Sequence, residues 1–508
     1  MRAPAAWRVS LGPYAAGLRR NVGFAAERLA NAAERLAKLL PMATRVRLAI
    51  AGRAERSTLA TTALAVVLAA LVGLATAKLG SFQHQLKALV IVTAGLAMVV
   101  AALRPDFGLV ILLALIPFEF GFYGTDSDHV LLWTLALVMM WRIRARDVPA
   151  WVALGGLALV AGSFIATLGA HNKSIALEGA VDWLGAILVL FVALAVLRER
   201  RDASRRMVDI FTGSAVIVVI FAFLQKSGID IIVGPPYSGS LPNSFLAYYT
   251  VYAGYVAMAA TLATGEVLIA LEQRKAARAS AYGAALVFML AGLAVSTSRG
   301  GIVALACGWL ILLVLNVHRG PTLARVLVIL AIFAAAGYVA TPSSTIATIE
   351  HRFSVSNGTQ GGDKARFALH KAGERALSTH PFGLGFGNFA YYLSNGSRNS
   401  NIRQNFFHAH ETPIQIGLDA GWIGLAGFLV LFAGPILLVF TRRGGGISAL
   451  RASAFAAALA GFMAQGLYDY LFYDMAFLVF FVVLVWGTIH SLSIDSLPKL
   501  SPSRPAHR

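Results

Sequence analysis

Charged side chains are scarce in this sequence. They make up 13% of its 508 residues, whereas soluble domains contain about 25%. Hydrophobic residues make up 58%, which is too many for a disordered segment, and the charge is too low for a soluble globular enzyme. Both of those classes are therefore excluded. Cysteine is almost absent as well: Cys307 stands alone, which excludes an intrachain disulfide and a cysteine-rich zinc site.

Long apolar runs, by contrast, recur along the whole sequence. A helix of about 20 apolar residues crosses the hydrocarbon core of a bilayer. We therefore predict an all-α polytopic integral membrane protein with about 14 transmembrane helices. The predicted spans are residues 59–77, 88–103, 108–122, 130–141, 151–169, 181–197, 208–224, 245–263, 282–296, 301–317, 326–340, 413–440, 452–467 and 476–492.

Positive charge is in excess, with 43 Lys and Arg against 24 Asp and Glu. In a soluble protein such an excess would point to nucleic acid, but in a membrane protein it collects in cytoplasmic loops. If residues 1–57 are cytoplasmic, most of the Lys and Arg fall on that same side. We therefore expect both termini in the cytoplasm, an even number of spans, contacts with membrane lipids, and no nucleic-acid partner.

The sequence divides into five parts. Residues 1–57 are a basic leader with the repeated stretches AAERLAN and AAERLAK, predicted either as an amphipathic helix on the membrane surface or as a short solvated helix or tail. Residues 58–280 are predicted as N-terminal transmembrane helices and 281–440 as a core. Residues 441–492 are predicted as C-terminal transmembrane helices, and 493–508 as a cytoplasmic tail.

One predicted connection on the outer side is much longer than the others. Residues 341–412 are polar and carry seven Lys or Arg and five His. A basic outer segment opposes the usual charge bias, and long ordered loops are common places for binding and catalysis. We expect a partly helical periplasmic loop that covers an outward-facing cavity.

Two arginines are candidates for function, one before this loop and one inside it. Arg299 follows small hydroxyl residues at the outer end of a predicted span, and Arg366 opens a predicted helical stretch. A guanidinium keeps its charge and binds phosphate through two parallel hydrogen bonds. Both residues are candidates to hold a phosphate group. The alternatives are a membrane-interface anchor for Arg299 and a solvated amphipathic helix for Arg366.

The end of the loop carries two histidines. His408 and His410 are two residues apart, which does not match the spacing of a zinc-binding pair on a helix, so we expect no metal. A neutral imidazole can remove a proton from a sugar hydroxyl near neutral pH. Asp419 is a carboxylate inside a predicted span and is therefore a functional candidate. Packing at the membrane interface is the alternative for the histidines.

Two further acids, Glu119 and Asp474, lie at predicted outer ends of spans. Asp474 closely follows Tyr468, Tyr470 and Tyr473 in the sequence. Tyrosines at such positions either form an interfacial aromatic belt or stack on sugar rings, and the sequence leaves both interpretations open.

The order of these motifs, from about residue 281 to 431, resembles the O-antigen ligase/polymerase superfamily of bacterial membrane glycosyltransferases. The matching pieces are Ser298-Arg299-Gly300, Arg366, His380-Pro381 with Gly383, Gly385, Gly387 and Phe389, Ala409-His410, and Asp419 with Gly421. Two positions depart from the family pattern. His370 stands where an aromatic residue is common, and Glu411 stands where Asn is common.

The resemblance implies an enzyme of the bacterial inner membrane. It would transfer a glycan from undecaprenyl diphosphate to an acceptor hydroxyl at the periplasmic face, with inversion and without metal or other cofactor. Arg299 and Arg366 would clamp the diphosphate, His410 would act as general base, and His408 and Asp419 would contact substrate. The acceptor is a second glycan in a polymerase and lipid A core in a ligase, and both remain open. A chain-length regulator is a candidate partner.

Two other functions are alternatives to this one. A transporter or flippase of lipid-linked glycans would place ionisable residues near the middle of the membrane and often contains internal repeats, neither of which the sequence shows clearly. A non-catalytic subunit of a polysaccharide secretion complex would tolerate loss of Arg299, Arg366 or His410.

Overall fold

A computed structural model describes the chain over residues 143–198, 200–229, 248–320, 361–396, 408–442, 446–473 and 475–494, with isolated positions between these stretches. The chain divides into two compact units, residues 1–90 and 91–508, and every described residue belongs to the second. The predicted leader, the first three predicted spans and the end of the tail lie outside the described residues. The predicted spans 130–141 and 326–340 are described at isolated positions alone.

All regular elements of the described residues are helices, and eight are long and apolar enough to cross a membrane. They are α6 (Ala150–Gly169), α7 (Lys173–Val196), α8 (Ala203–Lys226), α9 (Tyr249–Glu272), α10 (Ala276–Ser296), α16 (Thr412–Thr441), α17 (Ile447–Gly466) and α18 (Met475–Ser493). The shorter elements are η3 (Ala145–Asp147), α11 (Arg299–Leu315), α14 (Gly361–Thr379) and α15 (Phe389–Gly396). The prediction of an all-helical polytopic membrane protein is confirmed, while the total of about 14 helices and the periplasmic place of the loop stay predictions.

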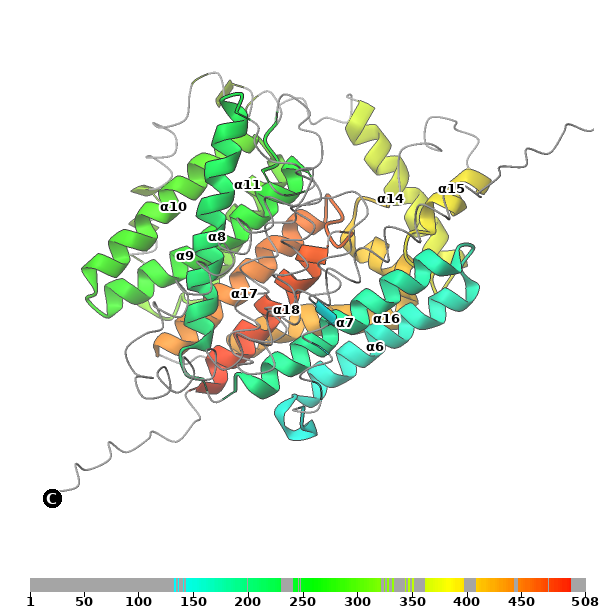
Figure 1. Ribbon diagram of the computed structural model, residues 1–508, viewed down its shortest axis with the longest axis horizontal. Helices are drawn as coiled ribbons and strands as arrows, with labels where there is room; N and C mark the ends of the chain where they lie inside the picture. Colours follow the sequence, from blue (N-terminus) through cyan, green and yellow to red (C-terminus); the bar gives the residue numbers. More distant parts are fainter. Residues whose placement is uncertain are drawn as a thin grey trace, which may run out of the picture. The chain divides into compact units, whose positions relative to one another are not determined.

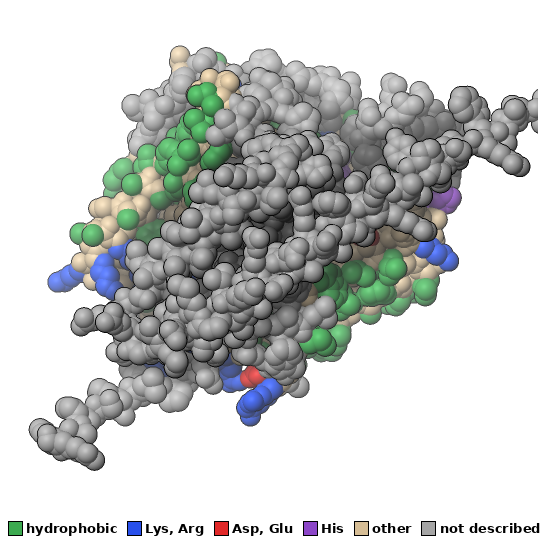
Figure 2. All heavy atoms as spheres, in the orientation of Figure 1, with side chains coloured by type: hydrophobic (Ala, Val, Ile, Leu, Met, Phe, Trp, Pro, Cys, Tyr) green, Lys and Arg blue, Asp and Glu red, His purple; other side chains and the backbone are tan. Residues whose placement is uncertain are grey.

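The core helices are α9 and α18, which are almost wholly buried within the bundle. Helices α6, α10, α11 and α16 instead leave large apolar side chains exposed, among them Leu154, Leu168, Leu310 and Leu437. Figure 2 shows such apolar side chains along the visible flanks of the described helices. Exposed leucines at these positions are what a lipid-facing surface requires, since lipid tails replace the protein core as their partners.

Helices α6 and α16 pack together in opposite directions (Figure 1). Gly162 of α6 lies against the backbone of Gly424 in α16. Gly155, which is nearer the start of α6, lies against Gly427. A Cβ at Gly162 or at Gly427 would collide with the backbone of the facing helix. Small residues allow this close approach, which is the usual basis of helix association in membranes.

A buried charge cluster joins three helices at the end of the bundle where α9 ends and α10 and α17 begin. The carboxylate of Glu266 in α9 accepts hydrogen bonds from Arg451 Nε of α17 at 2.5 Å and from Arg278 Nη2 of α10 at 2.7 Å. A buried carboxylate needs such paired partners to offset its loss of hydration.

Helix α16 is broken at Gly421, whose φ is 66° and ψ is −176°. The segment that begins at His380 satisfies the backbone groups released by this break. The carbonyl of Leu418 accepts N–H bonds from Leu384 at 2.5 Å and Gly385 at 3.2 Å, and Trp422 donates to the carbonyl of Pro381 at 3.0 Å. A broken helix is tolerated in a membrane where neighbouring protein groups pair its free N–H and C=O groups.

The glycines of this segment allow it to enter the space between helices. Gly383, Gly385 and Gly387 all have positive φ, a conformation that residues with a Cβ rarely adopt. Gly383 lies against Gly421 of α16, and Gly385 lies against Ala176 of α7. The spaced glycines therefore form a loop that fixes α14 and α15 against α6, α7 and α16.

Candidate active site

Arg299 is placed by a short turn between α10 and α11. Thr297 ends α10 with a positive φ of 48°, and the Ser298 hydroxyl oxygen accepts a hydrogen bond from Gly301 N–H at 3.3 Å, which caps α11. Arg299 is the first residue of α11 and is half-buried. The positive end of the helix dipole attracts anions, so this turn combines a helix N-terminus with a guanidinium.

The start of α11 adjoins the end of α17. A Cβ at Gly300 would lie 3.2 Å from Gln465 Cγ of α17, and Gln465 Nε2 donates to the carbonyl of Thr250 at 2.8 Å. The chain beyond α17 turns at once, with Asp469 N–H donating to the carbonyl of Gln465. Arg299 and Asp469 are therefore at the same end of the bundle.

His410 immediately precedes α16 and has an unusual backbone. Its φ is 55°, a left-handed conformation that is uncommon for residues other than glycine and is often found at functional sites. Ala409 N–H donates to Gln415 Oε1 at 2.7 Å, and His370 Nε2 lies 3.2 Å from the carbonyl oxygen of His410. Groups from α14 and α16 thus hold the residue in place.

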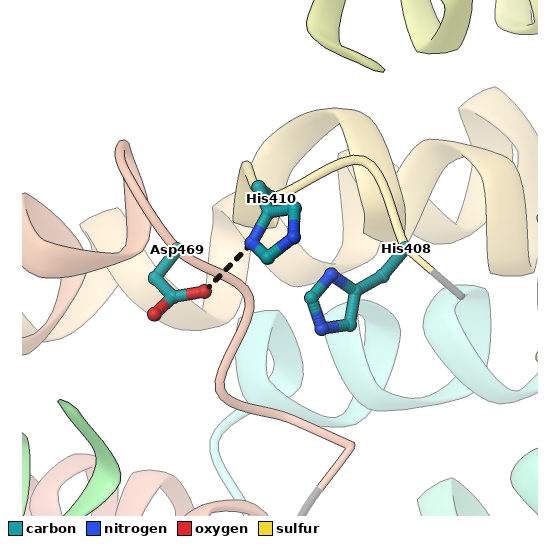
Figure 3. A group of neighbouring side chains, drawn as sticks. All are labelled: His408, His410 and Asp469. Carbon is teal, nitrogen blue, oxygen red and sulfur yellow. Dashed lines mark hydrogen bonds and ion pairs between the residues drawn. The ribbon is translucent and has the colours of Figure 1, made fainter. Parts of the chain in front are cut away.

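Asp469 orients the His410 imidazole (Figure 3). The His410 Nδ1 atom lies 3.1 Å from Asp469 Oδ1. Burial raises the pKa of Asp469, but the His410 hydrogen bond and the charge of Arg366 outweigh burial and bring the pKa below its usual value. An ionised carboxylate accepts from Nδ1–H, so the basic lone pair of the neutral imidazole is on Nε2.

His408 is the inner neighbour of His410. The two rings meet edge to face with centroids 4.2 Å apart, and His408 stacks on Tyr473 at 5.4 Å. Burial and the nearby His410 lower the pKa of His408 to about 4. His408 is therefore neutral at physiological pH, and its buried Nδ1 has no hydrogen-bond partner among the described residues.

Arg366 lies on α14 within electrostatic reach of this group. Its charge acts on both His408 and Asp469, lowering the pKa of each. The helical stretch predicted around Arg366 is present as α14. One turn further on, His370 lies 3.9 Å from the carboxylate of Glu411, so the two residues that depart from the family pattern are neighbours.

Asp419 lies deeper, inside α16, and is fully enclosed. Its carboxylate accepts from Gln415 Nε2 at 2.7 Å and from the Tyr470 hydroxyl at 3.0 Å. Tyr470 follows Asp469, whose carboxylate also accepts from Tyr470 N–H at 3.0 Å. Asp419 therefore does not contact His410 directly; it is connected to His410 through Tyr470 and Asp469.

Three of these groups form a compact set that could coordinate a cation. One ligand atom each from His408, His410 and Asp469 lie within 4.8 Å of one another. The positive charge of Arg366 acts on two of the three and opposes a cation there. The set therefore suits an oriented imidazole better than a metal site.

The structure brings together His410, His408 and Arg366, all of which the sequence predicted, and it places the start of α11 at the same end. It adds Asp469, which sequence reasoning missed. Asp469 lies 59 residues beyond His410, and no spacing rule connects the two. The nearest signal in the sequence is the tyrosine-rich stretch at 468–473. It drew attention to the adjacent Asp474, which lies outside the described residues.

Residues 284–429 match the family model described as O-Antigen ligase. The matched segment begins in α10, ends in α16 and contains Arg299, Arg366 and His410. No curated protein matches the chain. The match supports the O-antigen ligase-like superfamily, and together with the eight apolar helices it fits a multi-pass membrane enzyme that transfers glycans.

Proposed function

We propose that this protein is a metal-independent, inverting glycosyltransferase of the bacterial inner membrane. It moves a glycan from undecaprenyl diphosphate to an acceptor hydroxyl at the periplasmic face, either as a surface-polysaccharide polymerase or as an O-antigen ligase. The observation that carries the proposal is the His410–Asp469 pair at 3.1 Å. The charge of Arg366 acts on Asp469, and both Arg366 and His410 lie in the segment that matches the O-antigen ligase family model.

The transfer needs one base and one stabiliser of negative charge. His410 Nε2 takes the proton of the acceptor hydroxyl, whose oxygen bonds to the anomeric carbon of the donor. The bond from that carbon to the diphosphate oxygen breaks, and its electron pair leaves with undecaprenyl diphosphate. Attack opposite the leaving group inverts the anomeric centre. The ionised Asp469 stabilises the imidazolium that forms.

The arginines supply the complementary charge. Arg299 and Arg366 bind the diphosphate and offset the charge that grows on it as the bond breaks. The neutral His408 lines the same site and contributes a contact to substrate. Asp419 acts indirectly, because both of its oxygens already accept hydrogen bonds from Gln415 and Tyr470.

Deletion and complementation in the producing bacterium tests this function. The gene is removed, and wild-type or His410→Ala copies are returned at equal protein levels. Lipopolysaccharide gels and total exopolysaccharide are then compared. An O-antigen polymerase predicts loss of the ladder while the core with one repeat is retained. A polymerase of exopolysaccharide predicts loss of that polymer and an unchanged gel. A ligase predicts loss of every repeat from the core, with lipid-linked polymer accumulating.

The His410→Ala copy distinguishes chemistry from transport. We expect it to behave like the deletion, while the exposed His318→Ala copy restores the wild-type pattern. Full restoration by His410→Ala would contradict the proposed transferase and favour a flippase or a non-catalytic secretion subunit.

A further inference from the structure

A cavity of about 360 Å³ lies where α6 ends and α15 begins. It is lined by Gly169 at the end of α6, His171 from the α6–α7 connection, His380 and Asn388 from the loop before α15, and Tyr391 and Tyr392 from α15. His408, His410 and Asp469 do not line it. Sites for small organic ligands measure roughly 300–1,000 Å³, so the cavity can hold a sugar ring.

The walls of this cavity are held by a pair of asparagines. Asn388 is buried, and its Oδ1 accepts from Asn172 N–H at 2.7 Å while its Nδ2 donates to the carbonyl of Asn172 at 3.2 Å. Asn172 Nδ2 in turn lies 3.3 Å from the Tyr391 hydroxyl. This arrangement fixes both walls before any ligand arrives, which reduces the entropy lost on binding.

The chemistry of the lining suits a neutral polyhydroxylated ligand. The Tyr391 ring packs on His171 with centroids 4.7 Å apart, and the Tyr392 ring meets His380 edge to face at 5.7 Å. Tyrosines and imidazoles offer apolar ring faces together with hydrogen-bonding groups. A sugar ring presents C–H faces and hydroxyls in the same combination. Among the described residues that line the cavity there is no carboxylate or guanidinium, so a phosphate or a cation is less suited to it.

We propose that this cavity is a glycan-binding subsite that holds one sugar ring of a substrate glycan away from the bond formed at His410. The proposal rests on the proposed transferase function. Tyr392 packs on a small apolar cluster that includes Ala409, the residue before His410, so the subsite and the base are held by one packed unit. The bound ring belongs to the donor glycan or to the acceptor glycan, and kinetics distinguish these sources.

Gly169 allows the cavity to be filled without disturbing the fold. A Cβ there would meet no atom of the described residues within 4 Å, and the residue ends α6. The matched control is Gly213 on α8, where a Cβ also meets nothing within 4 Å. We expect Gly169→Trp to raise the KM of one glycan substrate about tenfold while kcat stays within threefold of the Gly213→Trp control.

The substrate whose KM rises identifies the source of the sugar ring. The proposal is overturned if neither KM exceeds the control by threefold, or if kcat falls with both KM values unchanged. Gly169→Leu and Tyr391→Ala provide smaller changes at the same site. We expect each of them to raise the same KM, so the test does not depend on one variant.

A binding measurement separates this proposal from the transferase proposal. The probe is the oligosaccharide released by mild acid from the lipid-linked glycans of the producing cells, and binding to the full chain in nanodiscs is measured by saturation-transfer NMR. We expect binding to wild-type protein and to His410→Ala, with at least a tenfold loss in Gly169→Trp. If binding follows this pattern but the protein shows no transfer activity, the subsite proposal stands and the transferase proposal is wrong. Transfer activity with equal binding to Gly169→Trp and wild-type protein would do the reverse.

Discussion

The Nδ1 atom of His410 lies 3.1 Å from Oδ1 of Asp469, a residue 59 positions further along the chain. The two residues occupy the turns that begin α16 and follow α17, and Thr412 strengthens the junction by donating its hydroxyl to the carbonyl of Asp469 at 3.1 Å. An imidazole held this way by an ionised carboxylate has one defined tautomer and one basic nitrogen, as a general base requires.

Replacing Asp469 by Asn keeps the shape of the side chain and removes its charge. The amide can present an N–H to Nδ1, which favours the tautomer with its proton on Nε2 and removes the lone pair needed for catalysis. We expect kcat to fall by about 10²–10⁴-fold, with partial recovery in Asp469→Glu.

A split between kcat and KM distinguishes orientation of the base from a purely structural role of Asp469. Asp469→Asn changes the tautomer of His410 and leaves the other substrate contacts in place, so we expect kcat to fall while KM stays within about threefold of the wild-type value. Both constants are measured on protein whose thermal unfolding matches the wild type. An unchanged kcat would exclude the orienting role.

The two arginines should not tolerate lysine. Arg299→Lys and Arg366→Lys keep one positive charge but lose the planar pair of donors that binds a diphosphate. We expect each to reduce kcat/KM for the lipid-linked donor by about 10–10³-fold, in line with loss of a charge-stabilising contact. The control is Arg375→Lys, an exposed position on α14. Equal rates for the Arg366 and Arg375 variants would contradict the clamp.

The break in α16 should be intolerant of a side chain. At Gly421 the φ is 66°, and a Cβ would lie 2.6 Å from the backbone carbon of Phe382. Gly421→Ala therefore costs backbone strain of about 1–3 kcal/mol in addition to a steric clash. We expect a lower midpoint of thermal unfolding in detergent, whereas Gly213→Ala, in open space, should leave the midpoint unchanged. Equal midpoints for the two variants would mean that the loop and α16 are not packed as described.

Stability should depend on the charge state of His408. Burial lowers its pKa to about 4 from the ordinary value of 6.5, so between these two values the unfolded chain binds a proton that the folded chain does not. The free energy of unfolding should therefore fall as the pH is lowered from 6.5 to 4. His408→Gln removes this contribution, so its thermal midpoint should fall less over the window than that of the His318→Gln control. Parallel curves for the two variants would show that His408 does not titrate in this way.

The helices were predictable from the sequence because a membrane-spanning helix needs a long apolar run. The described helices α6 to α11 and α16 to α18 each overlap a predicted span, although their ends differ. The roles proposed for Arg299, Arg366 and His410 came from a resemblance and from the chemistry of their side chains. Helix periodicity alone would not have brought them together, because they are distributed over more than 100 residues.

Asp469 shows where sequence reasoning ends. Its contact with His410 depends on how α16 and α17 pack, and packing between distant segments has no local sequence signal. Asp419 shows the same limit, because its partners in the fold also could not be read from the sequence. A carboxylate inside a span predicted contact with substrate, yet the fold supplies Gln415 and Tyr470 as its partners, which favours a supporting role.

The proposed role of His410 is that of the base in a glycan transfer from undecaprenyl diphosphate. The most direct test uses the full chain, purified and placed in liposomes with lipid-linked glycan and acceptor, in the presence of EDTA, while release of undecaprenyl diphosphate and growth of the acceptor are measured together. We predict equal amounts of both products from wild-type protein and from His318→Ala, and a rate at least 100-fold lower from His410→Ala, as loss of a general base implies. Transfer by His410→Ala at the wild-type rate, or no transfer by the wild-type protein with both substrates present, would contradict the account.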